Sequence, residues 1–194
     1  MKIKELFEDT SSHVTFCFGR MNPPTIGHKQ LFDTMKKVGG EFKIFLSPSQ
    51  DKKDNPLDYE TKIHFIQQMF PEYANNIVVD SKLNTPVKVA SYLYDNGYRN
   101  VTFVAGDDRL PSMSKLLKDY NGVEGKAHGY YKFDLIDFES SGAREDGAPG
   151  ITGISASDAR MAAANDNLEL FKEKTGAGKL AKPLFDAVKK GLGK

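Results

Sequence analysis

The chain has 194 residues, 39% of them hydrophobic and 27% charged, which is typical of globular proteins, and its formal net charge is +1. Its 27 basic and 26 acidic residues nearly cancel, which argues against a protein that mainly grips a nucleic-acid backbone. Cys17 is the only cysteine, so intrachain disulfides and cysteine-rich zinc sites are excluded and a reducing, cytoplasmic setting is expected. Because no apolar run approaches the length of a membrane span, no membrane partner is expected.

Five β-rich segments alternate with helical patterns along the chain. The predicted strands are residues 14–20, 42–47, 76–80, 100–106 and 131–138, of which the first four are almost continuously apolar, as buried parallel strands are. Between the strands, helices are predicted from apolar stripes: Leu31, Phe32, Met35 and Val38 form one that ends near Gly39-Gly40, and Tyr59, Ile63, Ile66 and Phe70 form another. A third helix is predicted from Pro86, after a Thr85 cap, to near Gly97. This alternation predicts an α/β fold, a doubly wound and mainly parallel five-stranded sheet with helices on both faces.

The chain is expected to form one main domain with two short additions. We predict an N-terminal leader over residues 1–12, the domain over 13–166, and a C-terminal helical tail over 167–194 that packs on it. The segment 139–153 is polar and rich in glycine, and it is predicted to be a long loop before a late helix. Loops of that length in compact domains are usually functional or mobile.

The first segment that suggests chemistry is FGRMNPPTIGHKQLF, residues 18–32, where a predicted strand runs into a helix. The carboxyl end of a parallel strand followed by a helix N-terminus is a place where anions bind, because unpaired backbone N–H groups and the helix dipole point there. Thr25 is a suitable N-cap, Gly27 lets a phosphate approach the backbone, and His28 adds an imidazole beside it. A capped helix whose histidine merely packs is the alternative.

A second such segment is GISASDAR, residues 153–160. Ser155 and Asp158 have the spacing of a capping box, so a helix is predicted to begin here. Arg160 lies near the positive end of that helix, where a cation is unfavourable unless an anion is bound. Ser155 and Ser157 add hydroxyl groups. An ordinary helix start with a solvated arginine explains this segment alone equally well.

Taken together, TIGH and ISASDAR resemble the (H/T)xGH and ISxTxxR signatures of the nucleotidyltransferase superfamily, whose members have a Rossmann-like fold. GRMNPPTIGH is most similar to archaeal-type nicotinamide mononucleotide adenylyltransferases and to small bacteriophage-encoded nucleotidyltransferases. The resemblance implies an enzyme that joins a nucleoside triphosphate to a phosphorylated small molecule and releases pyrophosphate. It implies catalytic roles for Thr25, His28 and Arg160, and nucleotide binding by Gly19, Arg20, Gly27, Asp107, Ser155 and Ser157.

The acceptor side of the expected site is less sharply defined. SPSQDKKDNPLDYETK, after the second predicted strand, resembles the family's acceptor-side loop, which implies roles for Lys52, Lys53 and Asn55, although a solvated lysine pair is an equal alternative. Asp107, in VAGDDR, is expected at the ribose or base, or else as the cap of the next helix. Arg144 in the long loop is a further acceptor-phosphate candidate. No cluster has metal-ligand spacing, so Mg²⁺ is expected to be held mainly by the triphosphate and water.

Several alternatives remain open at this point. ATP and nicotinamide mononucleotide are the first expectations for the substrates, and CTP with a phosphorylated alcohol is second, because TGISASD also resembles a segment of cytidylyltransferases. A non-catalytic nucleotide-binding or virion-associated module of the same fold is the third. The leader contains tripeptides similar to those cut by phage prohead proteases, Ile3-Lys4-Glu5 and Leu6-Phe7-Glu8. Relatives form dimers or closed hexamers, so a homo-oligomer is consistent with the resemblance.

Overall fold

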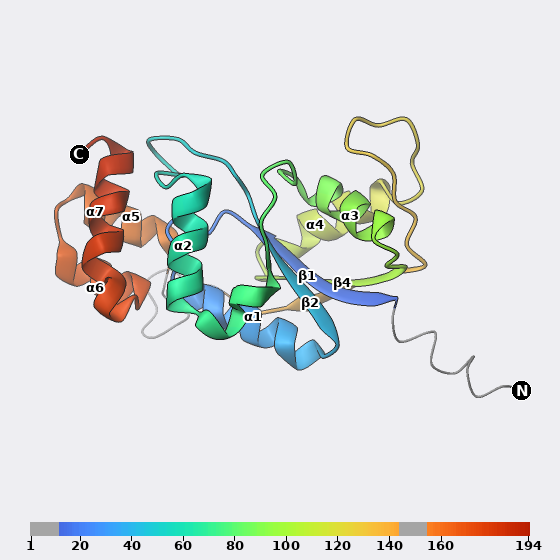
Figure 1. Cartoon of the computed structure of the whole chain (residues 1–194), viewed down its shortest axis with the longest axis horizontal. Coiled ribbons are helices and arrows are strands. Elements are labelled where there is room, and N and C mark those ends of the chain that lie inside the picture. The colour runs from blue at the N-terminus through green and yellow to red at the C-terminus, as the bar shows by residue number, and fades with distance from the viewer. Residues whose placement is uncertain (1–11, 144–154) are drawn as a thin grey trace, which may run out of the picture.

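The computed structural model describes residues 12–143 and 155–194. Five parallel strands lie in the order β3-β2-β1-β4-β5 (Figure 1). They are β1 (His13–Gly19), β2 (Glu41–Leu46), β3 (Ile77–Val78), β4 (Asn100–Ala105) and β5 (Leu135–Ser140). The prediction of a doubly wound sheet is confirmed, and every strand pair is parallel. Strands β2 and β3 are added on one side of β1, whereas β4 and β5 are added on its other side, so the strand order reverses between β1 and β4. In open α/β sheets, ligands bind at such switch points.

Helices cover both faces of the sheet. On one face α1 (Ile26–Val38) and α2 (Tyr59–Met69) pack through Phe32, Met35 and Ile66. On the other, α3 (Pro86–Asp95) and α4 (Leu110–Asp119) pack through Leu93 and Leu117. A short 3₁₀ segment, η2 (Pro71–Asn76), leads into β3. Thr85 caps α3 as predicted, with its side chain accepting a hydrogen bond from the Lys88 amide at 3.3 Å.

A third group of helices gathers at one end of the molecule, beside α2 (Figure 1). It contains α5 (Ala156–Ala164), α6 (Leu168–Thr175), the 3₁₀ turn η4 (Gly178–Leu180) and α7 (Ala181–Leu192). Its apolar core includes Phe171, Leu184 and Phe185, together with Leu57 from the loop before α2 and Phe65 from α2 itself. None of the helices within the described ranges is long and apolar enough to cross a membrane.

The fifth strand begins later than its predicted range of 131–138. Residues 131–133 instead pack against the end of α4, where the Tyr131 hydroxyl donates to the Leu117 carbonyl at 2.9 Å. The Asn121 side chain accepts a hydrogen bond from the Phe133 amide at 2.8 Å and donates one to the Phe133 carbonyl at 3.1 Å. The side chains of Tyr131 and Phe133 are both buried, so this segment belongs to the hydrophobic core although it does not form a β-strand.

Three smaller expectations also need revision. His13 is the first residue of β1, which begins one residue before its predicted range of 14–20, and its ring contacts the Thr102 hydroxyl at 2.9 Å. The third strand spans only two residues, and Val38 at the end of α1 is 37% exposed rather than part of the apolar face. Cys17 is buried, and burial raises the pKa of its thiol to about 12, which disfavours the reactive thiolate.

Candidate active site

A cavity opens at the carboxyl edge of the sheet, where β1 and β4 end side by side. Its walls come from residues 18–22, from His28 and Leu31 of α1, from residues 104–106 with Arg109, and from Asp54, Ala156 and Arg160. The predicted segments TIGH and ISASDAR, more than 120 residues apart, therefore meet at one place. The cavity lies at the switch point of the sheet, where a ligand is expected from the fold alone.

Positive charge dominates the cavity. Arg20, Arg109 and Arg160 line it together with His28, whereas Asp54 is its only carboxylate among the described residues. Ala156, the first residue of α5, also lines it, so the positive end of a helix dipole is close to the ligand space. Three arginines against one carboxylate make this cavity suited to a multiply charged anion.

His28 is held in one orientation by the residue that begins its own helix. The Thr25 amide donates to His28 Nδ1 at 2.9 Å, and the Thr25 hydroxyl lies 3.1 Å from the same nitrogen. Because Nδ1 accepts a backbone hydrogen bond, the neutral imidazole carries its hydrogen on Nε2. The ring thus presents Nε2 as a donor. Thr25 is the N-cap as predicted, and the histidine occupies the capping-box position that Glu or Gln usually holds.

The loop before α1 has an unusual backbone and few degrees of freedom. Met21 is buried with φ at +45°, a conformation that residues other than glycine rarely adopt and that is often found at functional sites. A side chain at Gly19 would meet the Met21 side chain at 3.2 Å, so the strand must end in glycine or force that neighbour to move.

Asn22 is one of the residues that the sequence analysis did not identify. It is 2% exposed, and its side chain bonds both backbone groups of Leu57 at 2.9 Å. Its own carbonyl accepts a hydrogen bond from Arg160 Nη1 at 2.9 Å. One buried asparagine therefore joins the loop after β1, the loop before α2 and the arginine of α5. An Asn-Pro-Pro run predicts a stiff turn, but it does not indicate partners 35 and 138 residues away.

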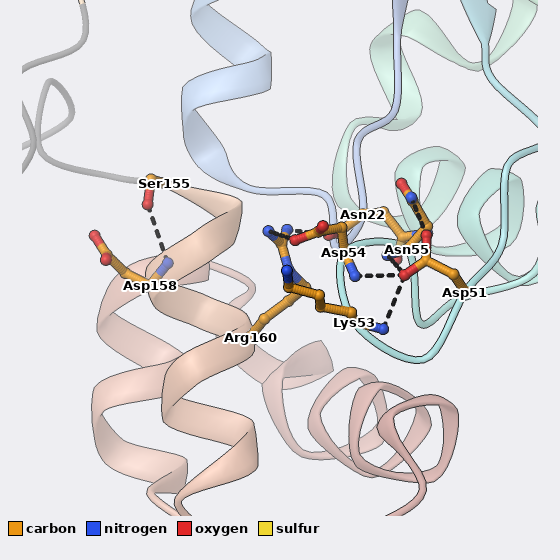
Figure 2. A network of polar contacts seen from close by, with 8 residues as sticks. All are labelled: Asn22, Asp51, Lys53, Asp54, Asn55, Ser155, Asp158 and Arg160. Atoms are coloured by element: carbon orange, nitrogen blue, oxygen red, sulfur yellow. Dashed lines mark hydrogen bonds and ion pairs between the residues drawn. The ribbon is translucent and has the colours of Figure 1, made fainter.

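Arg160 reaches from α5 toward Asn22 and Asp54, as Figure 2 shows. Besides Asn22, it contacts Asp54, with Nη2 and Oδ1 3.3 Å apart, and its side chain is 15% exposed. Burial lowers the pKa of Arg160 from its ordinary value, while Asp54 acts in the opposite direction. The helix begins at Ser155 as predicted, because the Ser155 hydroxyl accepts from the Asp158 amide at 3.0 Å, whereas Ser157 is exposed in the first turn.

The acceptor-side loop is organised around Asp51 (Figure 2). Its carboxylate accepts hydrogen bonds from the amides of Lys53 and Asp54, and from the side chain and amide of Asn55. The side-chain bond from Asn55 is the main reason that the pKa of Asp51 lies well below its usual range. Asn55 is buried and shapes this loop. Lys52 lines a separate groove with Lys190 and Gly191 of α7, away from the cavity that contains His28.

On the β4 side, the arginine rather than the aspartate lines the cavity. Asp107 is exposed, and its carboxylate accepts a hydrogen bond from Ser140 at the end of β5. Arg109, not Asp107, is the N-cap residue of α4, and Arg109 is also a wall of the cavity. Arg109 ends the same VAGDDR segment that drew attention to Asp107. Arg144 lies outside the described residues.

Gly27 is the second residue of α1, one position before His28, as expected for an unobstructed helix start. For metals, the described parts of the chain contain no group of three or more His, Cys, Asp or Glu side chains that could hold an ion. Where a metal ion enters, the ligand and water would have to supply most of its coordination.

Comparison with known proteins agrees with this geometry. Residues 16–135, more than half of the chain, match a family model described as cytidylyltransferase-like. A solved structure assigned as a nicotinate-nucleotide adenylyltransferase from Vibrio parahaemolyticus superimposes with a TM-score of 0.51 at 13% identity, covering 89% of this chain and 98% of that one. A search of curated proteins found no match. The structural likeness shows the shared fold, and the family match shows that this chain belongs to the cytidylyltransferase-like family of the nucleotidyltransferase superfamily.

Proposed function

We propose that this protein transfers a nucleotidyl group from a nucleoside triphosphate to a phosphorylated small molecule and releases pyrophosphate. The observation that carries the proposal is the cavity at the switch point, lined by His28 and three arginines and reached by the first residue of α5. A triphosphate is the common ligand whose charge best matches these walls. Membership of the cytidylyltransferase-like family supports the same chemistry.

In the proposed reaction, an oxygen of the acceptor phosphate attacks the α-phosphorus, and the bond from that phosphorus to the oxygen bridging the β-phosphate breaks. Negative charge grows on the α-phosphate oxygens and on the departing pyrophosphate. His28 Nε2 is assigned to the α-phosphate oxygens, and Arg160 to the β- and γ-phosphates. The Thr25–His28 hydrogen bond fixes the donor before the substrate arrives, so little reorganisation is needed during the reaction.

Mg²⁺ fits this site only as a companion of the triphosphate. Asp54, the carboxylate of the cavity, is already paired with Arg160, so phosphate oxygens and water would supply most ligands. When bound, the ion would neutralise phosphate charge in the same direction as the arginines. The protein's own share of the chemistry is to orient the phosphates and the histidine.

For the substrates, ATP with nicotinamide mononucleotide remains our first proposal. The arginine in ISASDAR favours adenylyl transfer, and the superimposed structure is assigned to an enzyme of that kind. CTP with a phosphorylated alcohol is the second proposal, supported by the TGISASD segment. A non-catalytic binding module is disfavoured because His28 and Arg160 are both present and both line the cavity.

Pyrophosphate release, measured for four nucleoside triphosphates with a panel of phosphorylated acceptors, tests the proposal. We expect one triphosphate and one acceptor to give turnover well above all other pairs. Nicotinamide mononucleotide, choline phosphate and glycerol phosphate separate the two substrate proposals. Tight triphosphate binding without release for any pair would instead support the binding module.

A further inference from the structure

A buried lysine lies beneath the acceptor-side loop. Lys62, in the first turn of α2, is 0% exposed, and it is the only lysine or arginine in the described part of the chain that is fully buried. Lysine is almost never buried unless its charge has a partner. Here the Nζ group donates to the backbone carbonyls of Ser47 and Ser49, the latter at 3.4 Å.

Those two carbonyls belong to the segment that leaves β2 and enters the acceptor-side loop. Ser47 is also tied to the cavity, because its amide donates to the Gly19 carbonyl at 2.9 Å and Gly19 is a wall of the cavity. The hydroxyls of Ser47 and Ser49 lie 2.7 Å apart, and the Ser47 hydroxyl also accepts a hydrogen bond from the Ser49 amide at 3.2 Å, so the two serines are joined locally. Lys62 thus joins α2 directly to the start of the loop, and Ser47 in turn joins the loop to the end of β1.

We propose that Lys62 is a positioning residue that sets the place of the acceptor-side loop relative to His28, and so controls the affinity for the acceptor rather than for the triphosphate. This inference depends on the proposed function. Both hydrogen bonds of the Lys62 amine are to backbone carbonyls, and the side chain is buried. Lys62 therefore fixes the path of the backbone and does not touch the substrate. Arg20, Arg109 and Arg160, which line the cavity, come from other segments. Arg160 also pairs with Asp54 of this loop, but its hydrogen bond to the Asn22 carbonyl does not depend on the loop and is expected to keep it in place.

The charge of Lys62 is sensitive to pH in the alkaline range. Burial lowers its pKa to about 8, and Asp58, the cap residue of the same helix, is the charged group that opposes this shift. The serines that face Nζ from the loop carry no charge. Both forms of Nζ can donate to the two carbonyls, the protonated form with three donors and the neutral amine with two. Because the buried site favours the neutral amine over the ammonium, releasing the loop and exposing Nζ to water becomes less favourable as the pH rises through about 8, so the anchoring should strengthen.

Kinetics of Lys62→Met and Lys62→Arg from pH 6.5 to 9.5 test this inference. In the wild type, the acceptor KM should fall several-fold as the pH rises across 8, while the triphosphate KM changes less than twofold. Lys62→Met and Lys62→Arg should both raise the acceptor KM and remove its pH dependence, because neither side chain can supply a neutral amine to the two carbonyls. Lys115→Met is the matched control, because Lys115 is exposed on α4 and pairs with Asp119 of the same helix.

A second readout does not depend on turnover. Amide hydrogen exchange over residues 49–56, corrected for intrinsic rates, should show lower protection in Lys62→Met than in the wild type or Lys115→Met. Unchanged protection, or a triphosphate KM that rises as much as the acceptor KM, would overturn the inference. If no substrate pair is turned over, the exchange result still decides the positioning role, and only the proposed function fails.

Discussion

At the start of α1 the functional side chain is held by its own helical turn, whereas at the start of α5 it is held by residues far away in the chain. His28 bonds to Thr25, three residues before it, while Arg160 bonds to Asn22 and Asp54, which are 138 and 106 residues distant. The first arrangement forms as soon as the helix does. The second requires the whole domain to fold, and its partners can be exchanged for a ligand.

Under the proposed function, this contrast gives the two helix starts different work. A donor fixed by a local backbone bond is suited to the reacting α-phosphate, where small displacements cost the most. An arginine with a carboxylate partner can leave that partner for phosphate oxygens when the substrate enters. The following four substitutions separate these roles, beginning with the largest expected effect.

His28→Ala should reduce turnover by about 100- to 1,000-fold while leaving triphosphate Kd within a few-fold of the wild type, because it removes a donor that acts mainly in the transition state. Turnover by rapid quench and Kd by calorimetry would measure the two effects. His64→Ala, which removes an exposed histidine on α2, is the control and should change neither. Full activity in His28→Ala would remove this residue from the mechanism.

Arg160→Ala should raise the triphosphate KM by about 10- to 100-fold and also slow turnover, as expected for the loss of charge-assisted hydrogen bonds. Arg160→Lys should give an intermediate value, because lysine keeps the charge but not the planar pair of donors. Steady-state kinetics with varied triphosphate provide the measurement. An unchanged KM in Arg160→Ala would contradict the assignment of this arginine to the β- and γ-phosphates.

Lys62 should leave a mark on stability as well as on the acceptor-side loop. Its pKa is about 8 when folded and about 10.4 when unfolded, so between those values the unfolded chain binds the extra proton and stability rises with pH. The wild type should gain about 2 kcal/mol in free energy of unfolding between pH 7.5 and pH 9.5 relative to Lys62→Met. Urea unfolding of both proteins at pH 7.5 and pH 9.5 measures the difference. Parallel changes in the two proteins would show that this pKa is not lowered.

Asp54→Asn should have the smallest effect and the opposite sign to Arg160→Ala. It removes the negative charge that pairs with Arg160 and opposes an incoming anion, so triphosphate Kd should tighten by about two- to fivefold at low salt. Asp119→Asn, on an exposed pair of α4, is the matched control. Weaker binding in Asp54→Asn would mean that this carboxylate helps to hold the ligand, directly or through a metal ion.

Local patterns in the sequence were sufficient for the parts of the site that form locally. The caps at Thr25 and Ser155 and the parallel strands followed from residue spacing, because each depends on neighbours within one turn or one strand. Asn22, Asp54 and Arg109 could not be found in this way. Their roles come from partners in other segments, and a single polar residue in a loop has no periodicity that marks it.

One wrong prediction and one missed residue have the same physical origin. Residues 131–133 have the composition of a strand, but tertiary bonds to Asn121 and Leu117 determine their backbone. Lys62 sits next to Ile63 on a helix that otherwise follows the expected apolar pattern, and no pattern shows that its amine would be buried against two carbonyls. Long-range polar contacts, rather than hydrophobic periodicity, are what the sequence alone did not reveal.

The most direct test of the central claim is the fate of labelled phosphates in a single-turnover reaction. With the triphosphate and acceptor identified by the release panel, label at the α-phosphate should appear in the acceptor product, and label at the γ-phosphate should appear in pyrophosphate. Both transfers should be strongly reduced in His28→Ala and unchanged in His64→Ala. Transfer of the γ-label to the acceptor would mean phosphoryl rather than nucleotidyl transfer, and would contradict the function assigned to this cavity.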